Sequence, residues 1–562
     1  MDFVLALHSH LPYVLNHGRW PHGSDWLCEA ALDTYLPLIE VLQGLARDDI
    51  SAPITIGFTP VLANQLTSPT FADEMDAFFG QRLAACEEAP ASLGGTGDSH
   101  LLPLVGYWRS RFCRLQTLFH GIDRDITSAF RRLEEQGRLE IIGSAATHGY
   151  MPLLGRDESI RLQFAVGARE HRRIFGRPPV GCWLPECAYR PHGRWTAAGP
   201  ERARTRPGTE EFLQAAGFRY FFTDAHLAHA GSALGTYADV PLGAERFDAE
   251  RHEDAAAPGA SAERSPYRPY QIASTRKASS VAALVRDPLS SMRIWSRHHG
   301  YPGDEWYLEF HKIRWPGGLR FWRVSMANSD LGAKQSYDPG QAQRKAVDHA
   351  GHFAHLLTTL PVTRADGVGV VTAPFDTELF GHWWYEGVDF LGAVYRRLAG
   401  QPRNGVKPVT GSAALRDDPA KTRLRLAEGS WGANGDHSMW MNDRTAWTWQ
   451  RLWPLEDAFW SAAHEVINVP AARPALAQAA RELLLAQASD WQFIISTGVV
   501  ADYGERRFRG HCHDAEQLIA LLAGSKRDPS ALEAATARAA ELARRDDLFP
   551  DILESVAAVL HD

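Results

Sequence analysis

Residues 368–376 read VGVVTAPFD, a run of small and β-branched apolar residues that ends in a carboxylate. Six other short apolar runs have the same character, namely Phe3 to Leu7, Ile54 to Phe58, Leu139 to Gly143, Val180 to Leu184, Phe218 to Thr223 and Val281 to Val285. Short runs that stay apolar at successive positions are typical of strands buried on both faces of a parallel sheet. Together with Val368 to Thr372, they predict seven strands.

Helical patterns lie between several of these runs. Asp123 to Gln136 and Arg156 to Phe175 repeat apolar residues at helical spacing, and the second pattern ends at Gly176, a residue suited to a helix C-terminus. Because short strands alternate with helices, the sequence predicts a βα barrel. Residues that follow the strands of such a barrel line one mouth. The chemically active side chains in these positions are His8, His10, His148, Glu186 and Asp376.

Two segments and the C-terminal part interrupt this alternation. Glu87 to Gly106 and Ala249 to Pro266 are rich in small residues and are predicted to be surface loops. From about Ala413 onward the strand-like runs end, and helical patterns predict a separate helical domain. The clearest patterns are Ala471 to Ala488, Asp514 to Ala523 and Pro529 to Arg545. Asp514 and Asp528 are expected to cap the last two helices.

Length and charge limit the class of protein. A chain of 562 residues exceeds the size at which one hydrophobic core usually stops growing, so more than one domain is expected. The composition, 45% hydrophobic and 22% charged, is that of a globular protein, and the net charge of −8 provides no basic surface for nucleic acid. Nucleic-acid binding is therefore disfavoured.

The N-terminus and the cysteines predict a cytoplasmic protein. Met1 to His8 lacks the basic region and the length of a signal peptide, and no stretch reaches the roughly 18 apolar residues that a membrane helix needs. The six cysteines are scattered without metal-site spacing, which favours reduced thiols and no disulfides. No membrane partner is expected.

Tryptophan is unusually abundant, with 18 residues. Core packing accounts for many of them, and the spacing of Trp449, Trp453 and Trp460 predicts a packed helix face. An indole also suits sugar rings, which offer apolar faces and polar edges. Trp431 and Trp440 are the candidates for sugar stacking.

Two segments place an acid after a strand in aromatic surroundings, WLPECAY at 183–189 and APFDTELFGHWW at 373–384. Glycoside chemistry needs two carboxyl groups, because one attacks or stabilises the anomeric carbon while the other protonates the leaving oxygen. Glu186 and Asp376 are the candidates, and Glu378 is the less favoured acid. A structural role for Glu186 in a salt bridge is the alternative reading.

A metal site is a second alternative for the same residues. His8 and His10 lie on the same side of an extended segment, and with Asp376 or Glu186 they could assemble a zinc site. Zinc hydrolases usually offer a tighter ligand motif, and neutral histidines also bind sugar hydroxyls. The sequence therefore favours a site without metal or other cofactor.

Several long segments, in the same order, resemble glycoside hydrolase family 57 and within it the branching enzymes. They are HSHLPY (8–13), EIIGSAATHGYMPLL (140–154), WLPECAY (183–189), YPGDEWYLEFHK (301–312), APFDTELFGHWWYEG (373–387) and SDWQFIISTG (489–498). The resemblance implies an α/β fold with an incomplete, TIM-like (β/α)7 barrel at residues 1–187 and 245–400. It further implies a small inserted domain at 188–244 and a helical C-terminal domain at 413–562 that contributes to the substrate cleft.

The same resemblance implies a retaining 1,4-alpha-glucan branching reaction, with Glu186 as nucleophile and Asp376 as general acid/base. A tyrosine on a flexible loop, here Tyr237, is implied to favour transfer over hydrolysis. The implied glucan contacts are His8, His10, Trp20, His148, Arg286, Trp295, Gly303, Trp431, Trp440 and Asp490. The implied partner is an α-1,4-glucan such as amylose or glycogen, and a monomer is favoured.

Other functions stay open from the residues alone. Within the family, a 4-α-glucanotransferase or an α-amylase would use the same two acids. Outside it, a zinc-dependent hydrolase or a non-catalytic glucan-binding protein would share the aromatic cleft. Asp490 equally suits a helix cap. Two departures from the family pattern, Val499 in place of a glutamine and the loop Ala249 to Pro266, bear on specificity and not on the acids.

Overall fold

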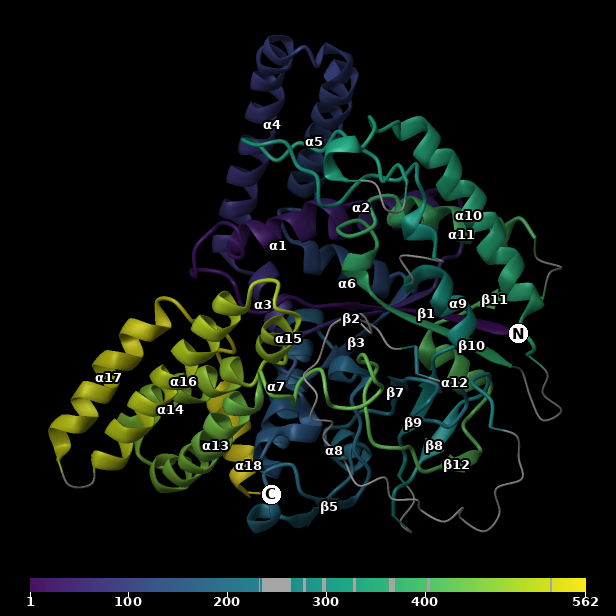
Figure 1. The fold of residues 1–562 in the computed structure, drawn as a ribbon. Coiled ribbons are helices and arrows are strands. Elements are labelled where there is room, and N and C mark those ends of the chain that lie inside the picture. The colour runs from purple at the N-terminus through teal and green to yellow at the C-terminus, as the bar shows by residue number, and fades with distance from the viewer. Residues whose placement is uncertain are drawn as a thin grey trace.

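A curved sheet forms the centre of the computed structural model, which describes residues 1–231, 233–234, 264–275, 279–295, 300–326, 330–362, 369–401, 405–525 and 528–561. Its strand order is β10-β1-β2-β3-β4-β7-β9-β8-β12, with β11 paired to β1 (Figure 1). The strands are β1 (Asp2–Ser9), β2 (Ile54–Phe58), β3 (Leu139–Ser144), β4 (Gly181–Trp183), β7 (Tyr220–Thr223), β8 (Tyr270–Ile272), β9 (Ala282–Val285), β10 (Val370–Asp376), β11 (Lys407–Pro408) and β12 (Thr422–Leu424).

The seven predicted strands are β1, β2, β3, β4, β7, β9 and β10, and each pairs in parallel with its neighbours of this set. A parallel bridge between Arg286, just after β9, and Thr372 of β10 brings the two ends of this set together. The sheet therefore curls into an incomplete barrel, and the predicted fold class is confirmed. The prediction that strands end near Ala413 was wrong, because β12 pairs with β8 and extends the sheet.

Helices follow the strands and cover the sheet, since each buries its apolar side there. Helices that follow the barrel strands include α2 (Leu36–Arg47), α3 (Pro60–Leu66), α6 (Ile126–Glu135), α7 (Asp157–Phe175), α9 (Pro288–Trp295), α10 (Pro339–Thr359) and α11 (Gly387–Ala399). Gly176 ends α7 in the left-handed conformation, as its sequence predicts. This alternation places the carboxyl ends of the parallel strands on one side of the sheet.

The prediction of a surface loop at Glu87 to Gly106 was wrong. These residues form no surface loop, because α4 (Pro69–Thr96) continues through Pro90, and α5 (Leu102–Gly121) begins soon afterwards. Cys86, Ala89 and Leu93 recur at helical spacing and are buried, so the small residues between them concealed an amphipathic pattern. In Figure 1, α4 and α5 form a helical hairpin that projects from the sheet. Most of the second predicted loop, Ala249 to Pro266, lies outside the described residues.

The C-terminal part is helical, as predicted. Its helices are α13 (Ala446–Val466), α14 (Arg473–Ala486), α15 (Asp490–Thr497), α16 (Ala501–Gly524), α17 (Pro529–Ala543) and α18 (Ile552–His561). The Asp528 side chain caps α17 by accepting a hydrogen bond from the Ser530 amide, which confirms that prediction. Asp514 caps nothing, because α16 begins at Ala501 and the Asp514 carboxylate binds Arg538 and Arg545 instead.

The segment between β4 and β7 carries a small antiparallel pair, β5 (Gly193–Trp195) and β6 (Arg204–Arg206), followed by α8 (Thr209–Ala215). The range 188–244 also includes β7, which is a strand of the barrel sheet. The boundaries of the domains stay a prediction. None of the helices that the structure describes combines the length and apolar character needed to cross a lipid bilayer. All six cysteines are free thiols.

Candidate active site

Glu186 lies at the carboxyl end of β4, in a strained turn. Its backbone has a left-handed φ of 59°, and His148, which follows β3, has a φ of 58°. Such values are uncommon for residues other than glycine, and they cluster at functional sites. The turn is maintained by a hydrogen bond from the Trp431 amide to the Glu186 carbonyl oxygen, at 3.1 Å.

The Glu186 carboxyl group is enclosed but not paired with a fixed cation. Trp431 Nε1 donates a hydrogen bond to Oε2 at 2.8 Å, and His148 Nδ1 lies 3.8 Å from Oε1. Burial raises the pKa of the Glu186 carboxyl to about 7, while the hydrogen bond from Trp431 opposes the shift. The indole N–H therefore stabilises the ionised form of this carboxyl.

Asp376 is the last residue of β10 and lies opposite His8 of β1 in the register of the sheet. Burial raises the pKa of Asp376 well above its ordinary value, and the charges of Glu186 and Glu378 add to this shift. Arg286 opposes it. The negative charge of Glu186 contributes to this shift, so Asp376 is more easily protonated while Glu186 is ionised.

Three histidines stand beside the acids. His8 Nε2 lies 2.9 Å from His148 Nε2, and His10 Nε2 lies 2.9 Å from an Asp490 carboxylate oxygen. Burial lowers the pKa of both His8 and His148 well below the ordinary value, so these rings are neutral at neutral pH. The His8 ring also stacks on Trp183 at 4.6 Å between centroids. We call His8, His10, His148, Glu186 and Asp376 the active-site cluster.

A metal ion has a candidate set of ligands here. Ligand atoms of His10, His148 and Asp490 lie within 4.8 Å of one another. His10 Nδ1 already has Thr59 Oγ1 at 2.9 Å, and His148 Nδ1 has Ser489 Oγ at 2.9 Å. These ring nitrogens thus have hydrogen-bonding partners from the protein, and these partners fix the orientation of both rings.

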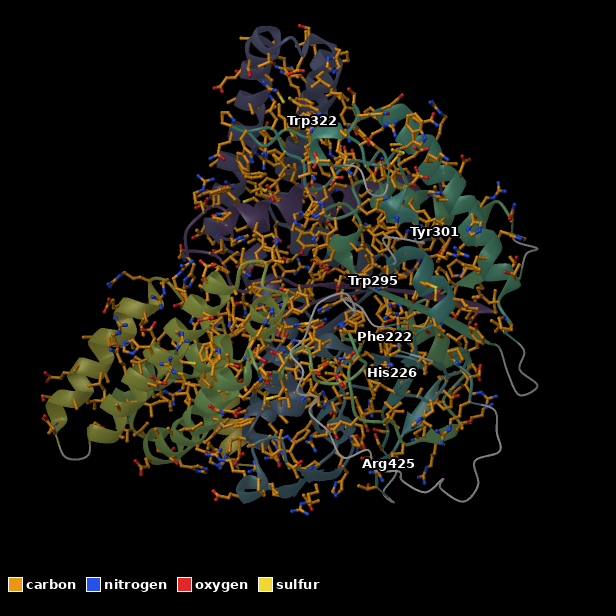
Figure 2. All side chains as sticks on the ribbon, in the orientation of Figure 1. Phe222, His226, Trp295, Tyr301, Trp322 and Arg425 are labelled. Carbon is orange, nitrogen blue, oxygen red and sulfur yellow. The ribbon has the colours of Figure 1, made fainter. Side chains whose placement is uncertain are left out.

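Arg286 and two tryptophans form the adjacent wall. The guanidinium of Arg286 is buried, donates to Asp224 at 3.2 Å and lies 5.6 Å from the centre of the Trp431 ring. Trp295 packs edge-on against Trp431, at 5.9 Å between centroids. Figure 2 labels Trp295, as well as His226, whose Nδ1 lies 3.5 Å from Asp224. This wall is aromatic and carries one buried ion pair.

Glu378 differs from Glu186 and Asp376 because its carboxylate accepts a hydrogen bond from a backbone amide. Its Oε1 accepts a hydrogen bond from the His10 amide at 3.1 Å and another from the Tyr35 hydroxyl. Burial raises the pKa of Glu378 to about 7. Glu378 therefore supports the loop that carries His10. Sequence reasoning missed Asp224, Tyr35, Trp183 and Ser489 as site residues. Asp224 directly follows the predicted strand Phe218 to Thr223, a position that could have indicated it, whereas Tyr35 contacts the site only through the fold.

The remaining predicted residues differ in how deeply they are buried and in what they contact. Trp440 is buried and stacks on Tyr150 at 4.4 Å. Gly303 ends a short helix, η6 (Tyr301–Gly303). Trp20 is 65% exposed. Tyr237 lies outside the described residues. Trp449, Trp453 and Trp460 are buried, which confirms their prediction as core residues.

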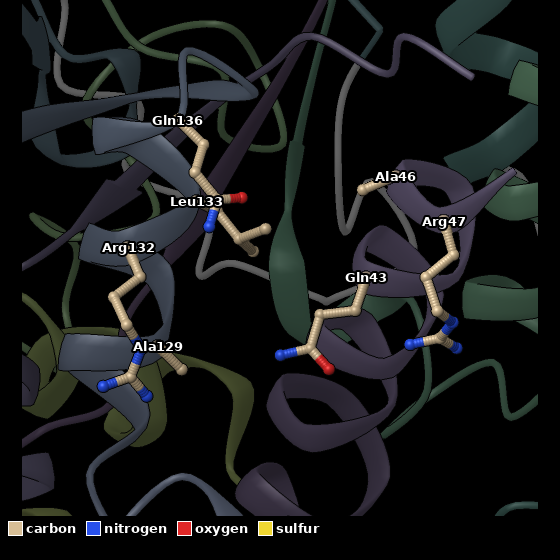
Figure 3. Close-up of a pocket in the computed structure, with 7 residues that line it drawn as sticks. All are labelled: Gln43, Ala46, Arg47, Ala129, Arg132, Leu133 and Gln136. Atoms are coloured by element: carbon tan, nitrogen blue, oxygen red, sulfur yellow. The ribbon is translucent and has the colours of Figure 1, made fainter. Parts of the chain in front are cut away.

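A surface pocket of about 260 Å³ lies between α2 and α6 (Figure 3). It is lined by Gln43, Ala46, Arg47, Ala129, Arg132, Leu133 and Gln136. The C-terminal ends of these two helices lead into the amino ends of β2 and β3, whereas the active-site cluster follows the carboxyl ends of strands. The pocket is therefore at the opposite end of the barrel from the acids.

Comparison with known proteins agrees with the fold and the motifs. Glycosyl hydrolase family 57 matches residues 4–423, and the C-terminal domain of 1,4-alpha-glucan branching enzymes matches residues 455–556. A 1,4-alpha-glucan branching enzyme of Thermococcus kodakarensis is 38% identical over 98% of this chain and 77% of its own length. Its crystal structure superposes with a TM-score of 0.87, covering 99% of this chain and 96% of that one.

Two further crystal structures are similar over nearly the whole chain. The branching enzyme of Pyrococcus horikoshii is 35% identical, with a TM-score of 0.85 and coverage of 99% of this chain and 96% of that one. The α-amylase AmyC of Thermotoga maritima is 26% identical, with a TM-score of 0.77 and coverage of 99% of both chains. The resemblance inferred from the motifs is thereby confirmed: the chain belongs to glycosyl hydrolase family 57.

Proposed function

We propose that this chain is a retaining 1,4-alpha-glucan branching enzyme, which cleaves an α-1,4-glucan and transfers the released chain to a C6 hydroxyl group. Relatives that bear the name of this activity align with the whole chain, including the C-terminal helices. The observation that carries the proposal at the site is that the fold brings the two acids to one group of side chains. Asp376 lies opposite His8 in the sheet, His8 contacts His148 at 2.9 Å, and His148 lies 3.8 Å from Glu186.

In the first half of the reaction, a Glu186 carboxylate oxygen attacks C1 of a glucosyl unit, and the bond from C1 to the leaving oxygen breaks. Asp376 gives its proton to that oxygen, so that the departing chain leaves as an alcohol. The product is a glycosyl ester on Glu186. The Trp431 N–H favours an ionised Glu186, while Asp376, surrounded by two other carboxyl groups, is the better place for the proton.

In the second half, ionised Asp376 takes the proton of an acceptor C6 hydroxyl group. The acceptor oxygen attacks C1, and the ester bond to Glu186 breaks. Two inversions leave the new α-1,6 bond with the original anomeric configuration. This mechanism requires the two carboxyl groups to be about 5–5.5 Å apart.

The other residues are proposed to bind glucan. His8, His10 and His148 are proposed to contact glucan hydroxyl groups, and Asp490 fixes the orientation of His10. Trp295, Trp431 and Trp440 are proposed to form the aromatic wall, together with the buried Arg286. The C-terminal part contributes Trp431, Trp440 and Asp490, so the helical region is proposed to complete the cleft. Trp20 and Gly303 are proposed as further glucan contacts, and Tyr237 is proposed to favour transfer over hydrolysis.

The deciding experiment incubates the purified protein with amylose and quantifies α-1,6 linkages by proton NMR, beside an assay of reducing ends. New α-1,6 signal with few new reducing ends is the expected result. The similarity to the T. maritima α-amylase favours hydrolysis as the second candidate, which would give reducing ends without branches. A chelator control tests the zinc-dependent alternative, since only that enzyme would lose activity.

Location and assembly belong to the same proposal. We expect the enzyme to act in the cytoplasm, where its six free thiols stay reduced and α-1,4-glucans such as glycogen are stored. We also propose that it acts as a monomer, which size-exclusion chromatography with light scattering would test.

A further inference from the structure

Two tryptophans stand out because they are exposed. All 18 tryptophans lie in the part of the chain that the structure describes, and most of them are buried or half-buried. Trp20 is 65% exposed and Trp315 is 58% exposed, and their rings meet edge to face at 5.4 Å between centroids. Leaving two large apolar rings side by side in water forgoes the free energy of burying them.

The turn that carries Trp315 is fixed to α4. Its backbone closes through hydrogen bonds between Arg314 and Leu319 at 2.9 Å and between Gly318 and Arg314 at 3.0 Å. Arg82 of α4 donates to the Gly317 carbonyl at 2.6 Å, and Arg314 donates to the Ser92 hydroxyl at 2.6 Å. Gly317 has a φ of 101°, and a Cβ there would meet Ala85 of α4 at 2.5 Å. The close contact thus requires glycine.

The loop that carries Trp20 is fixed to the same helix. Arg19 Nε lies 3.0 Å from a Glu74 carboxylate oxygen, and an Arg19 guanidinium nitrogen donates to Asp25 at 3.2 Å. One helix therefore positions both loops, and the two indoles form a preorganised pair. Preorganisation lowers the entropy cost of binding, since fewer side-chain rotations are lost.

The pair lies on the side of the barrel that carries the active site. Trp20 belongs to the segment that leaves the carboxyl end of β1 just after His10. Its neighbour His22 packs on Tyr503 of α16 at 5.5 Å, and Tyr503 packs on Trp491 at 6.4 Å, beside Asp490. In Figure 1 the segment before α1 (Ser24–Ala30) lies between the foot of α4 and the C-terminal helices.

We propose that Trp315, together with Trp20, forms an aromatic platform that binds a distant part of the α-glucan chain outside the catalytic cleft. The proposal rests on the proposed function, because it names where the same polymeric substrate continues beyond the acids. Trp20 is already an expected glucan contact, whereas nothing in the family motifs points to Trp315. Two indoles bury roughly 150–250 Å² each, far less than the roughly 800 Å² per partner of a stable protein interface. A sugar chain fits this area.

Binding is measured in the Glu186→Gln background, so that no variant alters the polymer during the experiment. Native electrophoresis in gels that contain amylose gives the dissociation constant of each variant, and calorimetry gives that of maltotriose. We expect Trp315→Ala to weaken amylose binding about fivefold or more and to leave maltotriose binding unchanged. Met326→Ala, which removes another strongly exposed side chain from the same segment, is the matched control and is expected to bind like its parent.

Trp315→Phe keeps a ring and is expected to retain most of the affinity, which guards against a variant that merely unfolds the turn. The platform is disproved if Trp315→Ala binds amylose like Met326→Ala, if Trp315→Phe is as weak as Trp315→Ala, or if maltotriose binding falls equally. Failure of the wild type to make α-1,6 linkages would instead reject the proposed branching activity, and the amylose gels would still decide the platform.

Discussion

Two regions of this molecule that contain buried acids surround them differently. In the active-site cluster, Glu186 and Asp376 are enclosed by rings and by other acids, and no arginine or lysine of the described residues forms an ion pair with either. In the helical region, a second group of acids is enclosed by cations and histidines. We call His17, Glu482, His511, Arg545 and Asp546 the helical-region network.

The helical-region network shifts the pKa values of its two acids in opposite directions. Asp546 accepts hydrogen bonds from His17 at 2.6 Å and from Arg545 at 2.7 Å, and these partners hold the pKa of Asp546 well below its ordinary value. Burial and the nearby Asp546 charge raise the pKa of Glu482. Glu482 Oε2 lies 2.7 Å from Nδ1 of His511, whose pKa burial lowers to about 3. The pKa of Asp546 is thus lowered and the pKa of Glu482 is raised.

The two regions differ in the cations that lie beside the acids, since the acids are buried in both. A buried carboxyl beside arginine is ionised at all ordinary pH values, so it can hold two parts of the chain together but cannot exchange a proton. The helical-region network joins the segment after β1 to α14, α16 and residues 545–546. Among the described residues, Glu186 and Asp376 form no such ion pair and burial raises the pKa of both, which suits the proton transfer proposed for them.

The largest expected effect comes from Glu186→Gln. If Glu186 is the nucleophile, the amide cannot form the glycosyl ester, and turnover of amylose should fall by about four orders of magnitude or more. Branch formation measured by NMR tests this. Thermal unfolding serves as the control, and normal turnover in a folded variant would move the nucleophile to another residue.

Asp376→Asn is expected to reduce turnover about 10²–10⁴-fold, since proton transfer to the leaving oxygen is lost. In the wild type the raised pKa of Asp376 extends its protonated form to higher pH, so activity should fall as pH rises through that pKa. The variant should lose this alkaline limb of the pH profile. An alkaline limb that persists unchanged would assign the acid to a different group.

Asp546→Asn is expected to lower the free energy of unfolding by about 3 kcal/mol, because it leaves the buried partners of Asp546 without their anion. The folded-state pKa is depressed, so the stabilisation exists above the unfolded-state pKa of about 3.9 and is lost as pH falls through the folded-state value. Urea unfolding at pH 7 and at low pH measures this. Asp547→Asn, whose side chain is 77% exposed, is the matched control and should change stability little. Equal stability of the two variants would remove the distinction between the regions.

The smallest effect is expected from Glu378→Gln. The amide oxygen still accepts from His10 and Tyr35, so turnover should fall about tenfold or less. Removal of a neighbouring negative charge lowers the pKa of Asp376, and the alkaline limb should therefore move to lower pH. A loss as large as that of Asp376→Asn would indicate that Glu378 is the acid.

Local sequence patterns predicted a large part of this protein. The seven barrel strands, the glycine that ends α7 and the aspartate that caps α17 each depend on residues a few positions apart, and such short-range signals survive in any context. The parallel-barrel prediction also implied that acids after different strands would meet at one end. Where small residues hid the periodicity, as in α4 beyond Glu87, the same method failed.

The sequence by itself determined the fold class, the family and which side chains have the chemistry for a glycosidase. Only the tertiary structure decided how each acid is ionised, because a pKa depends on burial and on partners from other elements. Trp431 is 245 positions from Glu186, and His17 is 529 positions from Asp546. Trp315 likewise reaches Trp20 only because α4 holds both loops. Contacts at such separations leave no pattern in the residues nearby, so the fold alone shows which acids are paired with a cation and which are not.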